Sequence, residues 1–126
     1  MHANELARII VNVAFKIHKE LGPGLFESVY ESVMEYELVN EYGLFVRRQV
    51  PVSVIWKEVK LELGFRADFI IENKIIVELK AIETIAPVHF KQMLTYLRLT
   101  RLKLGLLINF NENLIKNGIR RVVNGL

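Results

Sequence analysis

The sequence contains no cysteine, which excludes a disulfide framework, thiolate metal sites and a cysteine nucleophile. It also lacks an apolar run of membrane-spanning length, because the stretch IIVNVAF is broken by Asn12 and ends at Lys16. Glu5 and Arg8 stand where a signal peptide needs a basic end followed by unbroken apolar residues. No glycine-rich phosphate loop is present, since Gly22-Pro23-Gly24 is not followed by Lys and then Ser or Thr. We therefore expect a cytoplasmic protein that does not associate with membranes.

The length and composition predict a single globular domain spanning residues 1–126. Hydrophobic residues at 52% and charged residues at 25% exclude a disordered chain. The net charge of +3 is distributed unevenly: residues 87–126 hold seven Lys or Arg against one acid, a net +6, and the remaining residues carry a net −3. The basic part could contact a polyanion, or its charges could simply face solvent, and charge counts alone leave both open.

The spacing of apolar residues predicts an α/β fold in the order α-α-β-β-β-α-β, with a mixed central sheet flanked by helices. The expected helices are Leu6–Leu21 with Asn4 as N-cap, Phe26–Tyr42, and a third beginning at Pro87. The expected strands are Phe45–Trp56, Leu61–Ile71, residues 74–82 and Leu104–Phe110. Residues 119–124 are expected to form a short edge strand or a helical turn.

The stretch KIIVELKAI places two charged residues inside an apolar strand. Glu78 and Lys80 are two residues apart and therefore share one face of that strand. If the preceding turn is symmetric about Asn73, Asp68 lies directly opposite Glu78, and their Cβ atoms are about 4.5–5.5 Å apart. Two carboxylates that close repel each other unless Lys80, Arg66 or a divalent cation such as Mg²⁺ compensates them. A register shift of one residue would move the carboxylates to opposite faces.

Three motifs carry a family resemblance. Asp68 followed by Glu78-Leu79-Lys80 resembles the active-site signature of the PD-(D/E)XK nuclease superfamily. Gln92 and Tyr96 resemble the Q-x-x-x-Y motif of its exonuclease-like branch, and residues 24–30 match the G-x-x-E-x-x-Y motif of the GxxExxY protein family. The resemblance extends from about residue 9 to residue 123 and implies a restriction-endonuclease-like core.

The resemblance also implies a role for each matching residue. The metal ligands would be Asp68, Glu78 and the carbonyl of Leu79, with Glu27 as an extra acidic contributor. The metal would be Mg²⁺, for which Mn²⁺ would substitute. Lys80 would serve the attacking water, and Gln92 and Tyr96 would position the metal–water network or a phosphate. Two departures from the family patterns are Ala67, in place of the superfamily's motif proline, which is often absent, and Glu58, where the GxxExxY family often has glycine.

Plainer interpretations remain open for several of these residues. Glu27 in a first helical turn also complements the helix dipole, and Tyr96 could cap the core with its ring. His18 is expected to be packed or at the surface, because no His or Cys partner lies at metal-ligand spacing. Glu83 and His89 are either near the site or on the surface. A further set of glutamates is expected to face solvent: Glu31, Glu35, Glu37 and Glu41.

The function that these residues predict is Mg²⁺-dependent hydrolysis of phosphodiester bonds in nucleic acid, with DNA favoured over RNA. The alternative is a nuclease-like domain of weak catalysis that binds nucleic acid or a protein partner, and a homodimer is also open. A purely structural ion network ranks last, because such networks are costly. The residues expected to contact nucleic acid are Lys91, Arg98, Arg101, Lys103, Arg120 and Arg121.

Overall fold

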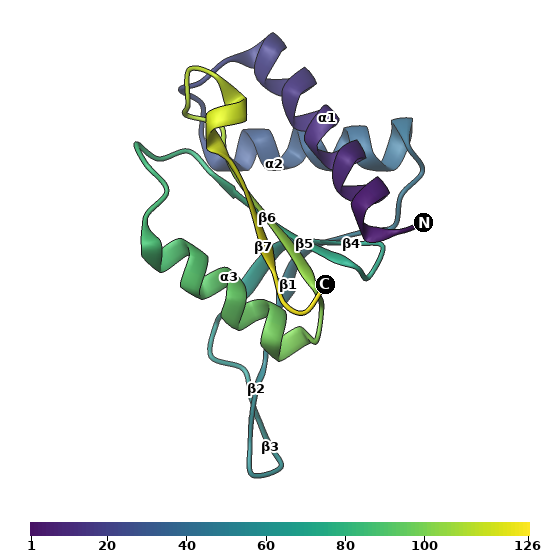
Figure 1. Ribbon diagram of the computed structural model, residues 1–126, viewed down its shortest axis with the longest axis vertical. Coiled ribbons are helices and arrows are strands. Elements are labelled where there is room, and N and C mark those ends of the chain that lie inside the picture. The colour runs from purple at the N-terminus through teal and green to yellow at the C-terminus, as the bar shows by residue number, and fades with distance from the viewer.

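A five-stranded sheet with helices on both faces forms the body of the protein, and the computed structural model describes all residues, Met1–Leu126 (Figure 1). Helices α1 (Ala3–Leu21) and α2 (Glu27–Tyr36) cover one face, and α2 continues into the π-helical turn η1 (Glu37–Glu41). Helix α3 (Pro87–Thr100) covers the other face. None of these helices combines the length and apolar character needed to cross a membrane.

The sheet is mixed, as predicted. Its strands lie in the order β1 (Val46–Pro51), β4 (Arg66–Ile71), β5 (Ile75–Lys80), β6 (Leu104–Asn109) and β7 (Ile119–Val123). Strands β5 and β6 pair in parallel, whereas every other neighbouring pair is antiparallel. Helix α3 is the crossover that a parallel pair requires. The C-terminal segment forms the edge strand β7 after a short 3₁₀ turn, η2 (Ile115–Gly118). Of the two structures expected for residues 119–124, the edge strand is therefore the correct one.

A hairpin outside this sheet is the main difference from the predicted elements. The chain leaves the sheet after β1 and forms β2 (Val54–Trp56) and β3 (Val59–Leu61), which pair only with each other. The expected long strands Phe45–Trp56 and Leu61–Ile71 were therefore wrong at the ends that enter this hairpin. Lys57 and Glu58 form its turn in the left-handed region, at φ of 47° and 72°. Alternating apolar residues continue through β1 and β2, so periodicity alone did not reveal that the chain changes sheet.

The two helix starts also differ from expectation. His2, and not Asn4, caps α1: its Nδ1 accepts a hydrogen bond from the backbone N–H of Asn4 at 3.0 Å. The first turn of α2 begins at Glu27 and not at Phe26. Both shifts are of one or two residues, the usual uncertainty of a helix end.

The sheet separates two hydrophobic cores. Val77 and Leu79 of β5 belong to the larger core under α1 and α2, whereas Ile76 belongs to the smaller core under α3. Because side chains alternate along a strand, Glu78 and Lys80 lie with Ile76 on the α3 face.

Helix α3 lies very close to the sheet where it crosses β6. A Cβ atom at Gly105 would clash with Sδ of Met93, which projects from α3. Glycine at this position therefore sets how near α3 can approach, and with it the height of every α3 side chain above the sheet.

Candidate functional site

Asp68 and Glu78 face each other across the β4–β5 hairpin. The register pairs Phe69 with Val77, so the next residues along the two strands are Asp68 and Glu78. This is the register predicted from a turn centred on Asn73. The two carboxylates therefore lie on one face of the sheet, below α3.

Burial and mutual repulsion dominate the electrostatics of this pair. Glu78 is only 5% exposed, and its Oε1 is buried with no hydrogen-bond partner. Burial, reinforced by the negative charge of Asp68, raises the pKa of Glu78 to about 9, although the ammonium of Lys80 opposes the shift. Asp68 is better satisfied, because its Oδ2 accepts a hydrogen bond from the backbone N–H of Leu79 at 2.8 Å.

The two cations expected to neutralise the pair do not form ion pairs with it. Lys80 lies half-buried at the end of β5 and has no carboxylate within ion-pairing distance. The guanidinium of Arg66 instead donates through Nη1 to the backbone carbonyl of Gln49 at 3.2 Å. The expectation that Arg66 compensates a carboxylate directly was therefore wrong, since its side chain turns toward β1.

Gln92 and Tyr96 of α3 lie above the carboxylates. Their side chains are joined, with Nε2 of Gln92 donating to the Tyr96 hydroxyl at 3.2 Å. Tyr96 is almost fully buried, and burial followed by the negative charges of Glu78 and Asp68 raises its pKa. The phenol is therefore close enough to the carboxylates to respond to their charge.

Glu27 and His89 both act on the backbone at the edge of this region. Oε1 of Glu27 accepts a hydrogen bond from the backbone N–H of Ala81 at 3.3 Å, which links the start of α2 to the end of β5. Nδ1 of His89 accepts from the backbone N–H of Ala86 at 2.9 Å and so caps α3. His89 therefore has a structural contact of its own that does not involve the carboxylates.

Gln49 is a member of the site that the sequence interpretation missed. Its Nε2 donates to Oδ1 of Asp68 at 3.2 Å and to Oε1 of Glu31 at 2.8 Å. Its backbone lies in the left-handed region at φ 53°, which is uncommon for a residue with a side chain. No pattern in the sequence distinguishes this glutamine from a surface residue of an edge strand.

Glu31 is buried, which contradicts the expectation that it faces solvent. It is 6% exposed, and its Oε1 accepts from Nε of Arg48 at 2.8 Å. Arg48 also reaches Glu35 at 3.3 Å. Arg48 interrupts a row of alternating valines in β1, and this charged exception was the available signal for a buried partner.

Asn109, at the end of β6, was also missed. It is completely buried, and its Oδ1 accepts from the backbone N–H groups of Ile82 at 3.1 Å and Asn111 at 3.2 Å. Its Nδ2 donates to the carbonyl of Ile82 at 2.8 Å. Because β5 and β6 end side by side, this side chain holds the loop that follows Lys80. A polar residue directly after an apolar parallel strand was the signal for it.

The six basic residues expected to contact nucleic acid do not form one surface around the carboxylates. Lys91 follows the first turn of α3, on the side where β5 ends. Arg101 and Lys103 line a pocket of about 220 Å³ with Lys74, at the opposite end of the sheet. The others are Arg98 on α3 and Arg120 and Arg121 on β7, where Arg121 donates to Oδ1 of Asn4 at 2.6 Å.

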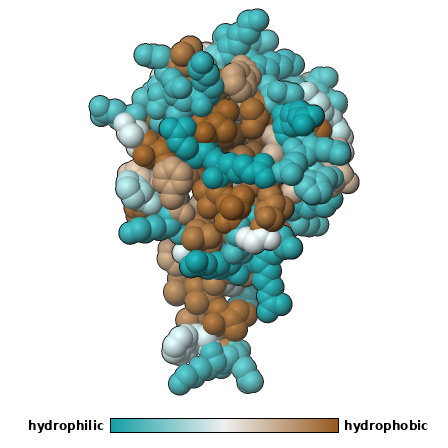
Figure 2. All heavy atoms as spheres, in the orientation of Figure 1, coloured by the Kyte–Doolittle hydropathy of each residue, from teal (hydrophilic) through white to brown (hydrophobic).

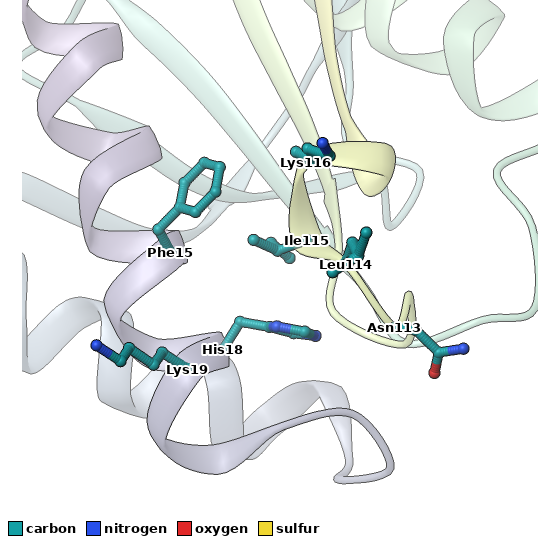
Figure 3. Close-up of a pocket in the computed structure, with 7 residues that line it drawn as sticks. All are labelled: Phe15, His18, Lys19, Asn113, Leu114, Ile115 and Lys116. Atoms are coloured by element: carbon teal, nitrogen blue, oxygen red, sulfur yellow. The ribbon is translucent and has the colours of Figure 1, made fainter.

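A separate pocket of about 340 Å³ lies between α1 and η2, away from these residues (Figure 3). Its polar side chains are those of His18, Lys19, Asn113 and Lys116, and no carboxylate lines it. Nε2 of His18 lies 2.7 Å from the carbonyl oxygen of Glu112. His18 is thus packed against the chain, one of the two roles expected for it, and the pocket lacks the carboxylates through which Mg²⁺ is usually bound.

The carboxylate pair itself fits a divalent cation. Glu78 has a buried oxygen with no partner, and Asp68 is opposite it, so a cation would satisfy the orphaned atom and remove the repulsion. No group of three or more His, Asp or Glu side chains lies close enough together to form a complete protein cage. Mg²⁺ does not need one, since it is usually bound by one or two carboxylates and keeps several waters.

Comparisons with known proteins identify the family and nothing narrower. A search of curated proteins and a search of solved structures both found no match. The sequence profile described as the PD-(D/E)XK nuclease superfamily matches residues 4–122, which includes both carboxylates, Lys80 and all of α3. The mixed five-stranded sheet with helices on both faces agrees with the core of that superfamily. The chain belongs to the PD-(D/E)XK nuclease superfamily.

Proposed function

We propose that this protein is a metal-dependent nuclease that hydrolyses phosphodiester bonds in nucleic acid. The observation that carries the proposal is the buried, unpartnered Oε1 of Glu78 directly beside Asp68, in a superfamily whose members are typically metal-dependent. A protein that used these residues only for stability would gain little from burying two repelling carboxylates together.

Each residue of the site then has a definite role. Asp68, Glu78 and the carbonyl of Leu79 would hold Mg²⁺ or Mn²⁺. Glu27, which is hydrogen-bonded to the backbone of Ala81 directly after β5, would be a further acidic ligand. The chemistry supplied by such a cation is polarisation of a phosphoryl oxygen and activation of water. Lys80 projects from the same face as Glu78 and would stabilise the negative charge that develops on the phosphate. The linked side chains of Gln92 and Tyr96 would position the substrate phosphate from α3.

We further propose that the chain belongs to the GxxExxY family within the superfamily, on the motif at residues 24–30 and the contact of Glu27 with Ala81, directly after β5. DNA is the proposed substrate in preference to RNA, and the cytoplasm is the proposed site of action.

One observation favours the alternative of a nuclease-like binding domain. Both oxygens of Asp68 already have protein hydrogen bonds, from Gln49 and from the backbone of Leu79. A carboxylate that is satisfied in this way has less to gain from a cation than Glu78 does. The alternative predicts nucleic-acid binding that neither requires Mg²⁺ nor leads to cleavage.

A cleavage assay decides between the two functions. Labelled single- and double-stranded DNA and RNA would be incubated with the protein in Mg²⁺ or Mn²⁺, with a chelator as the control. Wild-type protein should cut at least one substrate, and Lys80→Ala should lower turnover by about 10²–10³-fold, the scale seen when one transition-state donor is removed. Nucleic-acid affinity should change much less, because this charge acts mainly in the transition state.

Lys74→Ala is the matched control. Lys74 directly precedes the first residue of β5, at the end of the strand opposite Lys80, so its removal should leave turnover unchanged. Cleavage that persists in both Lys80→Ala and Glu78→Gln would mean a contaminating enzyme or another site. If wild-type protein cuts nothing in any metal, the binding function replaces the nuclease.

A further inference from the structure

The β2–β3 hairpin carries more exposed apolar surface than any requirement of the fold explains. It projects away from the body as a thin arm, and its stem is hydrophobic in the space-filling view (Figures 1 and 2). Trp56 is 64% exposed and Phe65, at the base, is 44% exposed. The other exposed apolar residues of this segment are Ile55, Val59 and Leu63. Exposed aromatic and aliphatic side chains gathered on one projection indicate an interaction surface.

The base of this arm is continuous with the candidate nuclease site. Phe65 directly precedes β4, and Arg66 and Asp68 follow it on that strand, about 7 Å apart from each other. The ring of Phe65 contacts the ring of Tyr96 edge-on, with centroids 6.4 Å apart. An aromatic path therefore leads from the arm to the tyrosine that lies above the carboxylates.

A notch of about 220 Å³ opens at the base of the arm. It is lined by Pro51, Val52, Glu62, Gly64, Phe65 and Arg66. This volume is below the about 300–1,000 Å³ of a typical small-molecule site and suits one planar ring. Phe65 offers a partly exposed aromatic face for stacking, and the donors of Arg66 that do not bind Gln49 are free for a phosphate. The charge of Glu62 is offset by Lys60 at 3.4 Å.

A second copy of the chain fits this surface less well. A stable protein interface usually involves about 20–30 residues on each side, whereas each strand of the arm has three. Its apolar residues also lie on both faces of the ribbon, since Ile55 pairs with Lys60 and Trp56 pairs with Val59 in the next position. A thin ribbon that is apolar on both faces can instead present side chains on which unpaired bases stack.

We propose that the base of the β2–β3 hairpin binds an unpaired nucleobase, by stacking on Phe65, and that the substrate is therefore a single-stranded nucleic acid or a frayed end. Arg66 contacts the phosphate of the same strand and directs it toward Asp68 and Glu78. This inference rests on the proposed nuclease function for its substrate class, but it makes a separate statement about binding.

The test measures binding in a chelator, so that neither metal nor cleavage enters the result. Fluorescence anisotropy would compare a labelled mixed-sequence single strand of about 12 nucleotides, within the length that one binding module covers, with its blunt duplex. The single strand should bind more tightly. Phe65→Leu keeps apolar packing against Tyr96 but loses the aromatic face, and should weaken single-strand binding about 5- to 100-fold, whereas Phe65→Tyr should retain it.

Phe45→Leu is the matched control, because Phe45 is an exposed phenylalanine at the opposite end of the sheet, and it should bind like wild type. Equal affinity for strand and duplex, together with no effect of Phe65→Leu, would overturn the inference. So would a concentration-dependent shift in the emission of Trp56, the only tryptophan, with a dimer in gel filtration, because the arm would then join two copies. Phe65-dependent binding without cleavage in Mg²⁺ would support the base site and remove the nuclease activity. Cleavage in Mg²⁺ that does not depend on Phe65 would support the nuclease activity and overturn the base site.

Discussion

Gln49 and Asp68 are joined by a side-chain hydrogen bond of 3.2 Å, and the same amide nitrogen of Gln49 lies 2.8 Å from buried Glu31. Helix α2, strand β1 and the acidic residue of β4 are therefore held in one arrangement. The left-handed backbone of Gln49 aims its side chain at this position. We infer that Gln49 orients the Asp68 carboxylate toward Glu78, a positioning role that leaves Gln49 out of contact with the substrate.

The first prediction tests that role. Gln49→Gly should weaken Mn²⁺ binding about 10- to 100-fold, which is the usual cost of removing a group that orients a metal ligand. Glycine adopts a φ of 53° without penalty, so the fold should be retained. Isothermal titration calorimetry measures the affinity. Asn73→Gly is the control, because Asn73 has a φ of 52° in the distant β4–β5 turn, and equal affinities for the two variants would rule out the positioning role.

The second prediction concerns pH. Because the folded-state pKa of Glu78 is raised from 4.5 to about 9, its contribution to stability is complete below about pH 4.5 and is lost as the pH rises toward 9. Glu78→Gln cannot ionise, so without metal its stability advantage over wild type should grow by about 1.4 kcal/mol for each pH unit above 4.5, to as much as about 5 kcal/mol near pH 8, with little difference near pH 4. Urea denaturation in a chelator at several pH values measures this. If the difference in unfolding free energy between Glu78→Gln and wild type became smaller as the pH rises, the Glu78 carboxylate would be stabilised in the apoprotein.

The third prediction separates the basic residues by position. Lys91 lies on the part of α3 nearest the end of β5, whereas Lys103 lies at the opposite end of the sheet. Lys91→Glu should therefore weaken nucleic-acid binding and reduce its salt dependence by about one phosphate contact, and Lys103→Glu should change neither. Binding isotherms at several salt concentrations measure both slopes. Equal effects of the two substitutions would mean that the substrate follows another path across the protein.

The fourth prediction tests the close approach of α3 to the sheet. Gly105→Ala should destabilise the protein by about 1–3 kcal/mol, because the new methyl group overlaps the Met93 side chain. Met93→Ala should be less costly in that background than in wild type, giving a coupling of about 0.5–3 kcal/mol in a double-mutant cycle. Simple additivity in urea denaturation would show that α3 moves away freely.

The sequence was sufficient to predict a mixed sheet, from the order of the elements, and the β4–β5 register with its pairing of Asp68 and Glu78, from local spacing. A short turn centred on Asn73 determines which residues oppose each other across the hairpin. The continuous apolar run before Asn109 likewise reflects burial on both faces of a parallel strand.

The contacts that were missed depend on chain segments that are far apart. Glu31 and Asp68 meet Gln49 only after α2 has packed beside β1, and neither spacing nor composition reports that packing. The departure of β2 from the sheet was also missed, because β-branched and aromatic residues such as those of β2 suit an isolated ribbon as well as a central strand. The turn at Lys57 and Glu58 lacks the glycine or asparagine that usually marks such a hairpin.

Alternation along β5 gives this single strand two independent tasks. Val77 and Leu79 point into the larger core and should tolerate only apolar substitutions of similar volume, whatever happens to the chemistry. Glu78 and Lys80 point to the other side, where exchange for neutral residues should change reactivity at little cost in folding. A library that randomises only positions 78 and 80 should thus yield many folded proteins with altered chemistry, whereas one that randomises positions 77 and 79 should yield few folded proteins at all.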